Sequence, residues 1–227
     1  MRIDSHVLYS ADHPPEHLQA ILARNKFDGA MLVVDGPPFP ETGPHIVGLI
    51  VRDPAALDAS PKVRGLCAPF DSHTIELAAE VSRRNLSFDA EIRPEYLPAL
   101  VPLARRFPDL RIAIDHLARP DYAAGMTDEW RQAMEAAARL PNVYCKLSGL
   151  LTEMPLPWTA SPIRPFVQHA LATFGPRRLM FGSEWPARLP DVTWKEALAA
   201  FTQSIGANPI EVRERLLGGT AAEFYSL

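Results

Sequence analysis

The chain has 227 residues, of which 47% are hydrophobic, and a formal net charge of −4 at pH 7. This length and composition favour one domain over 1–227 with a substantial core. Charges of both signs are interspersed, which argues against a nucleic-acid or membrane partner. No apolar run approaches the roughly 20 residues of a spanning helix. Because Met1 leads directly into an apolar segment and two cysteines require no disulfide, we expect a cytoplasmic protein without a signal peptide.

Strand and helix patterns alternate along the whole chain. Strands are expected at 2–9, 28–34, 46–51, 63–69, 86–92, 110–115, 143–147 and 178–181. Helices are expected at 14–24, 53–58, 72–84, 94–107, 127–140, 161–174, 193–205 and 209–217, before a C-terminal tail. Ser72 and Thr127 are expected N-caps. Pro98 and Pro102 should kink or divide the helix that contains them.

Eight strands that alternate with helices predict a (β/α)8 TIM barrel, with an open doubly wound sheet as the competing topology. The interval between Val34 and Ile46 departs from this pattern. It holds four prolines, which exclude a regular helix. The barrel should therefore lack the helix between its second and third strands. That loop or a second copy of the chain must then cover the strands, so a homodimer is one expectation.

Three apolar runs each end in an acid or an imidazole, at His6, His116 and Glu184. Ligands bind at the carboxyl ends of strands in α/β barrels, so these three side chains are expected to converge there. Glu184 is the expected general base, which would take a proton from water. The structural alternatives are an ion pair between Glu184 and an arginine, and capping or supporting roles for the two histidines.

Lys146 lies late in the predicted seventh strand, where an ammonium group is costly unless it is paired. It is therefore a candidate for binding a substrate carboxylate or for polarising a carbonyl. The alternative is a buried ion pair with Glu184 or Asp115.

Four further residues follow predicted strand ends and are candidates for contacts with the substrate. Ser148 could donate a hydrogen bond at the mouth of the barrel, and Trp185 could form a wall of the pocket. Arg119 and Arg188 could hold an anion through two hydrogen bonds each. A solvated surface position is the alternative for both arginines.

Four motifs, at 3–6, 114–120, 143–150 and 174–186, together resemble the amidohydrolase-related TIM-barrel hydrolases. The nearest branch contains the fuconolactonase and 2-pyrone-4,6-dicarboxylate hydrolase type of lactonase, and segment 219–225 is similar to that family's ending. The resemblance implies hydrolysis of a lactone or related ester. It also implies a strand-8 carboxylate that activates water, at Glu184, aided by His6 and His116, with Lys146 and Arg119 near the substrate.

Three departures from the family pattern bear on metal binding and substrate. The family's His-x-His becomes His6-Val7-Leu8, its strand-8 aspartate becomes Glu184, and an arginine of strand 4 is replaced by Cys67. Some relatives use a divalent metal, whereas the pyrone-dicarboxylate branch works without one. With one imidazole missing, metal affinity should be weak, so we expect no cofactor. The alternative is zinc held by His6, His116 and Glu184.

These observations favour a hydrolase of a small anionic lactone or related cyclic ester. Two alternatives remain. One is a non-hydrolytic barrel enzyme, such as a decarboxylase, dehydratase or cyclase. The other is a catalytically silent protein that binds a small molecule in the same pocket.

Overall fold

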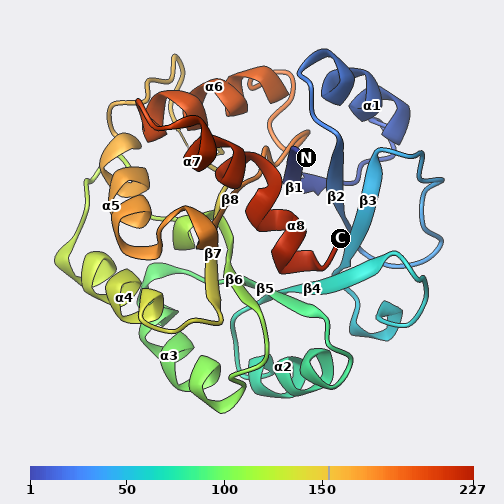
Figure 1. The fold of residues 1–227 in the computed structure, drawn as a ribbon, viewed down its shortest axis with the longest axis horizontal. Helices are drawn as coiled ribbons and strands as arrows, with labels where there is room; N and C mark the ends of the chain where they lie inside the picture. Colours follow the sequence, from blue (N-terminus) through green and yellow to red (C-terminus); the bar gives the residue numbers. More distant parts are fainter. Residues whose placement is uncertain (153) are drawn as a thin grey trace.

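The computed structural model describes residues 1–152 and 154–227. Eight parallel strands form one sheet in sequence order, inside a ring of helices (Figure 1). The strands are β1 (Ile3–Leu8), β2 (Gly29–Val34), β3 (Ile46–Val51), β4 (Val63–Pro69), β5 (Ser87–Glu91), β6 (Ile112–Ile114), β7 (Val143–Leu147) and β8 (Leu179–Phe181). The predicted (β/α)8 barrel is confirmed.

Hydrogen bonds between β1 and the segment after β8 bring the ends of the sheet together. The Glu184 amide donates to the His6 carbonyl at 2.8 Å, and the Leu8 amide donates to the Trp185 carbonyl at 2.8 Å. The Ser5 hydroxyl adds a bond of 2.7 Å to the carbonyl of Phe181. The seam of the barrel therefore passes directly through two of the predicted site residues.

The longer helices bury their apolar faces against the outside of the barrel. They are α1 (Pro15–Arg24), α2 (Thr74–Arg83), α3 (Leu97–Arg106), α4 (Asp128–Ala138), α5 (Arg164–Phe174) and α6 (Trp194–Ile205). Two short helices, α7 (Ile210–Glu214) and α8 (Thr220–Tyr225), end the chain. None of the helices in the described residues is long and apolar enough to span a lipid bilayer.

The connection from β2 to β3 contains no helix in residues 35–45, all of which are described. The prediction from its four prolines is confirmed. The helix expected at 53–58 is only one 3₁₀ turn, η1 (Pro54–Ala56). The Asp53 side chain caps this turn by accepting the Ala55 amide at 2.9 Å.

Three local predictions can be compared with the structure. Thr127 caps α4, since its hydroxyl accepts the Trp130 amide at 3.2 Å. Ser72 is not the cap of α2, which begins two residues later. The helix expected at 94–107 is divided into a 3₁₀ turn, η2 (Pro94–Tyr96), and α3, which has proline in its first turn.

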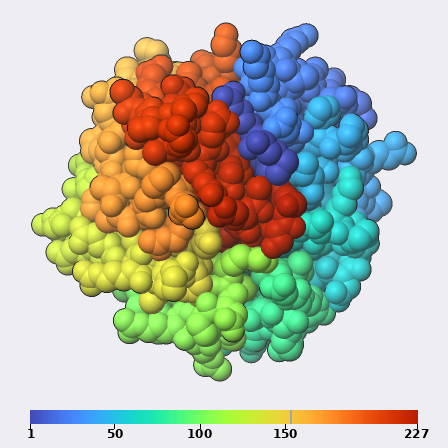
Figure 2. Space-filling model, viewed as in Figure 1, coloured from blue at the N-terminus to red at the C-terminus, as the bar shows by residue number. Residues whose placement is uncertain are grey.

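The C-terminal tail is α8, which sequence analysis did not predict, and it fills the amino-terminal end of the barrel (Figure 1). Figure 2 shows this segment (red) packed against the N-terminal residues (dark blue). Gly218 permits the contact, because a Cβ there would lie 2.5 Å from the Ile3 amide nitrogen. Inside the barrel, the buried side chains of α8 join those of the strands in one cluster: Ile3, Met31, Val33, Ile50, Cys67, Ala113, Met180, Ala221, Phe224 and Tyr225. The lumen is thus a packed core.

Candidate functional site

The structure brings His6, His116 and Glu184 together where strands β1, β6 and β8 end. The His6 and His116 rings meet edge to face, with centroids 4.7 Å apart. Nε2 of His116 lies 3.4 Å from Oε1 of Glu184. All three are buried, with exposed fractions of 0%, 1% and 6% respectively. Their strand-end positions in the sequence thus correctly indicated that they would converge.

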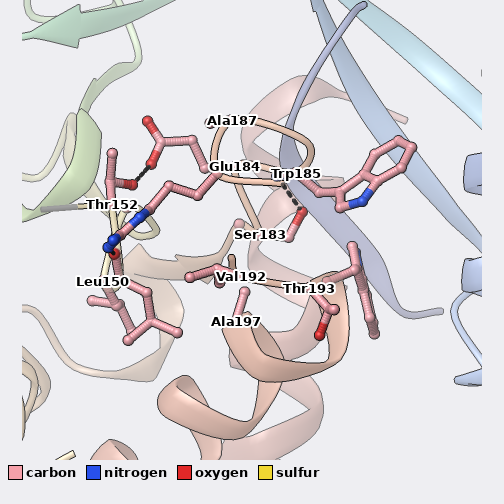
Figure 3. Close-up of a pocket in the computed structure, with 14 residues that line it drawn as sticks. Leu150, Thr152, Ser183, Glu184, Trp185, Ala187, Val192, Thr193 and Ala197 are labelled. Atoms are coloured by element: carbon pink, nitrogen blue, oxygen red, sulfur yellow. Dashed lines mark hydrogen bonds between the residues drawn. The ribbon is translucent and has the colours of Figure 1, made fainter. Parts of the chain in front are cut away.

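The Glu184 carboxylate is held from two sides. Its Oε2 accepts a hydrogen bond from the Thr152 hydroxyl (Figure 3), and its Oε1 lies 3.4 Å from Nη2 of Arg119. Burial raises the pKa of Glu184, while the Thr152 hydrogen bond and the Arg119 charge act in the opposite direction. The side chain of Arg119 is 24% exposed, so it connects this buried acid to solvent.

A cavity of about 20 Å³ adjoins Glu184 and is also lined by Gly149 and Thr152 (Figure 3). This volume suffices for one water molecule. Gly149 is required here, because its φ is +63° and a Cβ would lie 2.9 Å from Nδ1 of His116. One water molecule therefore fits in this cavity beside the buried carboxylate of Glu184.

Burial disfavours the charged form of both histidines of the site. Burial lowers the pKa of His116 well below its usual value, and the charge of Arg119 lowers it further. Burial likewise lowers the pKa of His6, aided by the charge of Lys146. Nδ1 of His116 pairs with the Ser148 hydroxyl at 2.9 Å, so Ser148 orients this ring.

A left-handed turn after β6 aims His116 and Arg119 at Glu184. The φ angles of residues 116–119 are +54°, +54°, +61° and +50°, although none of the four is glycine. Each such residue costs about 1–2 kcal/mol, so the surroundings must hold the turn in place. The indole Nε1 of Trp130 donates to the Leu117 carbonyl at 3.0 Å, and the Arg119 amide donates to the His116 carbonyl at 2.8 Å.

We expect Trp130→Phe to loosen this turn, because it removes the indole donor and keeps an aromatic ring in the core. The buried Leu117 carbonyl loses its partner, which should cost about 1–3 kcal/mol of unfolding free energy. Displacement of His116 and Arg119 should lower kcat about tenfold. Urea denaturation and steady-state kinetics measure both effects. Trp158→Phe, which removes an indole bond to Glu196 elsewhere, is the control. An unchanged kcat in Trp130→Phe would show that the turn needs no such support.

Lys146 is placed differently from its predicted role as a ligand of a substrate carboxylate. Its ammonium group is fully buried, 2.6 Å from Oδ2 of Asp89, 2.9 Å from Oδ1 of Asp115 and 3.0 Å from Nδ1 of His6. Burial acts to lower the pKa of Lys146, but the charges of Asp115 and Asp89 outweigh it and hold that pKa well above its usual value. The alternative ion pair with Asp115 is the one formed, and the one with Glu184 is not.

Arg188 and Trp185 line the same cavity as Glu184. Nη1 of Arg188 donates to the carbonyls of Leu151 and Met154, at 2.5 and 2.6 Å. Those bonds fasten the loop after β7 through Nη1, and binding of a substrate anion by Arg188 stays a prediction. Trp185 is buried and points away from Glu184 along the opposite side of the loop (Figure 3), where its ring packs against His13.

Four residues near the site were not selected from the sequence: Thr152, Asp89, Arg52 and Tyr225. Asp89 interrupts the otherwise buried strand β5, which was a usable signal of a paired charge. Thr152 and Tyr225 lie in a loop and a short helix that carry no pattern pointing to the site. Arg52 follows β3, and its charge contributes to lowering the pKa of Glu184.

His6, Asp115 and His116 each offer a ligand atom, and these atoms lie within 4.8 Å of one another. The set differs from the predicted one, which had Glu184 in place of Asp115. Lys146 hinders metal binding by this set of residues. The ammonium group has donors only, so Nδ1 of His6 must be the lone-pair nitrogen and the proton of the neutral ring sits on Nε2. A metal needs an imidazole nitrogen without its proton. A divalent ion at His6 would therefore compete with the hydrogen bond from Lys146.

Comparison with known proteins adds to this geometry. The sequence matches the family described as amidohydrolase over residues 7–227. It is 35% identical over 196 residues to an L-fucono-1,5-lactonase of Burkholderia ambifaria, covering 81% of this chain and 66% of that one. It is 36% identical over 154 residues to an L-fucono-1,5-lactonase of Burkholderia multivorans, covering 62% and 51%. The chain thus spans about half to two thirds of the length of these relatives.

Solved structures share the fold. An amidohydrolase from Burkholderia multivorans, solved with bound zinc in one crystal form, superposes with a TM-score of 0.80 at 24% identity, over 100% of this chain and 99% of that one. A probable 2-pyrone-4,6-dicarboxylic acid hydrolase from Acinetobacter baumannii, with citric acid bound, gives 0.80 at 17% identity over the same shares. The resemblance inferred from the motifs is confirmed, and the chain belongs to the amidohydrolase family.

Proposed function

We propose that this protein hydrolyses a lactone, a small cyclic ester, with Glu184 as the base that activates water. The observation that carries the proposal is the buried Glu184 carboxylate, set between His116 and Arg119 beside a cavity with room for one water. Family membership and similarity to L-fucono-1,5-lactonases support the same reaction class.

Glu184 takes a proton from the water, whose oxygen attacks the lactone carbonyl carbon. The ring C–O bond then breaks, and Glu184 returns the proton to the departing alkoxide, so the product is a hydroxy acid. Burial suits Glu184 to this role, because a raised pKa makes a carboxylate a stronger base. The Nε2 proton of His6 would stabilise the oxygen on which negative charge develops.

Arg119 contacts Glu184 and can be reached by solvent, so it would bind an anionic group of the substrate. With the Ser148 hydroxyl donating to Nδ1, His116 presents its Nε2 proton to Glu184. That contact would orient the carboxylate toward the water. The proposed steps use Glu184, His6, His116 and Arg119, and none of them requires a metal ion.

The proposal is tested by assaying the purified protein against lactones with and without a carboxylate and against acyclic esters of the same acids. Acid release is followed with a pH indicator, and the spontaneous rate is subtracted. We expect turnover of the lactones, fastest for the carboxylated ones, in the presence of a chelator. Release of carbon dioxide, or binding without turnover, would instead support the decarboxylase or the silent binding protein.

The pH dependence of kcat should report the Glu184–Arg119 contact. Activity requires the carboxylate, so it is present above the pKa of Glu184 and is lost as the pH falls through it. Arg119 lowers that pKa, so Arg119→Met should move the acidic limb to higher pH. Rate profiles from pH 4 to 9, set by the ordinary range of a carboxyl group, measure the shift. Arg83→Met, on the exposed face of α2, is the control. A limb that stays in place or moves to lower pH would contradict this assignment.

A further inference from the structure

The proposed reaction does not explain the buried ammonium group of Lys146 in the barrel interior. It has three N–H donors and three acceptors within 3.0 Å, on Asp89, Asp115 and His6. All four side chains are fully buried. The ammonium therefore donates hydrogen bonds to Asp89 and His6, forms an ion pair with Asp115, and is enclosed by these neighbours.

The hydrogen bond from Lys146 determines which nitrogen of His6 carries the proton. Because an ammonium group cannot accept a hydrogen bond, Nδ1 of His6 accepts, and a neutral His6 is protonated on Nε2. Nε2 is buried and has no hydrogen-bond partner among the described residues. Such a donor is costly unless a ligand supplies an acceptor. The ring edge lies against His116, beside Glu184.

We propose that Lys146 is a positioning residue that locks His6 as a donor toward the lactone carbonyl oxygen and withholds His6 from divalent metal ions. The same hydrogen bond produces both effects, since it fills the Nδ1 lone pair and leaves the proton on Nε2. The effect on turnover rests on the proposed function. The tautomer of His6 and its affinity for metal are independent of the proposed function.

The C-terminal helix completes the arrangement. The hydroxyl of Tyr225 on α8 donates to Oδ2 of Asp89 at 2.7 Å, the same oxygen that accepts from Lys146. The Tyr225 ring centroid lies 5.9 Å from Nζ of Lys146. Helix α8 therefore helps to fix the position of Asp89, which in turn pairs with the ammonium group of Lys146. Tyr225→Phe removes one hydrogen bond and keeps the ring that fills the space.

Loss of the ammonium would change the chemistry of the cluster. Lys146→Met keeps a long apolar side chain but leaves the carboxylates of Asp89 and Asp115 and the His6 ring without a cation. Carboxylate oxygens and imidazole nitrogens are ligands that zinc prefers. We therefore expect Lys146→Met to gain a zinc site that the native protein lacks.

The first measurement is the tautomer of His6 in the native protein, from long-range ¹H–¹⁵N spectra of protein labelled at its seven histidines. His6→Gln identifies the His6 signals. The expected result is a protonated Nε2 and an unprotonated Nδ1. A protonated Nδ1 would overturn the proposal, and this result needs no Lys146 variant to fold.

The second measurement is a calorimetric titration of the chelator-treated proteins with zinc. Native protein and Lys195→Met, a control on the exposed side of α6, should show no stoichiometric site at micromolar zinc. Lys146→Met should bind one equivalent, and its His6 signals should no longer report a pure Nε2–H form. Tight zinc binding by the native protein, or an unchanged tautomer in Lys146→Met, would overturn the proposal.

Kinetics separate a positioning role from a merely structural one. In Lys146→Met we expect kcat to fall about 100-fold with little change in KM, and in Tyr225→Phe a smaller fall of the same kind. A rise in KM alone would contradict the role of His6 as a donor to the developing oxyanion. If the tautomer and zinc results hold while no lactone is turned over, the proposed function fails, and the role of Lys146 in fixing the tautomer of His6 and excluding metal stands.

Discussion

Glu184→Gln should lower kcat for lactone hydrolysis about 10³-fold, within the range that general-base catalysis contributes. The amide matches the carboxylate in size, and its oxygen can accept from Arg119 while its NH2 group donates to the Thr152 hydroxyl. It cannot take a proton from water. Substrate binding should change little, because the proposal assigns the anion to Arg119, so KM should stay within a few fold of the native value.

The same substitution should not destabilise the fold. Burial raises the pKa of Glu184, so its ionised form costs folding free energy at neutral pH, and a neutral amide removes that cost. We therefore expect a Tm at pH 7 that is equal to or above that of the native protein. Glu76→Gln, at an exposed position of α2, is the matched control for both measurements. A kcat within tenfold of native in a folded Glu184→Gln would remove Glu184 from the reaction.

Asp4→Ala should cause a large loss of stability, about 3–5 kcal/mol of unfolding free energy. Oδ1 of Asp4 accepts the Ser183 amide at 2.9 Å and the His6 amide at 3.2 Å, and Oδ2 accepts the Trp194 indole at 2.7 Å. All of these donors would be left buried and unpaired. The bonds join β1, the segment after β8 and α6, so the seam of the barrel should open first.

Urea denaturation measures this loss, and kinetics under native conditions should show a parallel fall in kcat because His6 and Glu184 flank the seam. Asp12→Ala, in the exposed loop after β1, should change the unfolding free energy by less than about 0.5 kcal/mol. A loss below about 1 kcal/mol in Asp4→Ala would mean that Asp4 does not hold the seam.

The fold was predictable because the strands and longer helices carry clear apolar patterns, and because prolines at 35–45 exclude a helix there. One exception is α8, whose six residues are too few to show helical periodicity. Its position is set by tertiary packing: Phe224 and Tyr225 fill the lumen, and Gly218 allows close approach to β1.

The convergence of His6, His116 and Glu184 was predictable from their places at strand ends, since parallel strands all end at one rim. The ion pair of Lys146 with Asp115 was one of the alternatives from the sequence, but its pairing with Asp89 was not predictable, because Asp89 lies on β5 and meets Lys146 only through the register of the closed sheet. The left-handed turn at 116–119 had no sequence signal either. Without glycine or asparagine, only contacts such as that from Trp130 reveal it.

The most direct test of the central claim is a single turnover of a lactone in ¹⁸O-labelled water, with the product analysed by mass spectrometry. The account predicts one labelled oxygen in the new carboxylate of the product from native protein, and no product above the spontaneous rate from Glu184→Gln. An unlabelled product, or labelled product formed equally fast by Glu184→Gln, would contradict activation of water by Glu184.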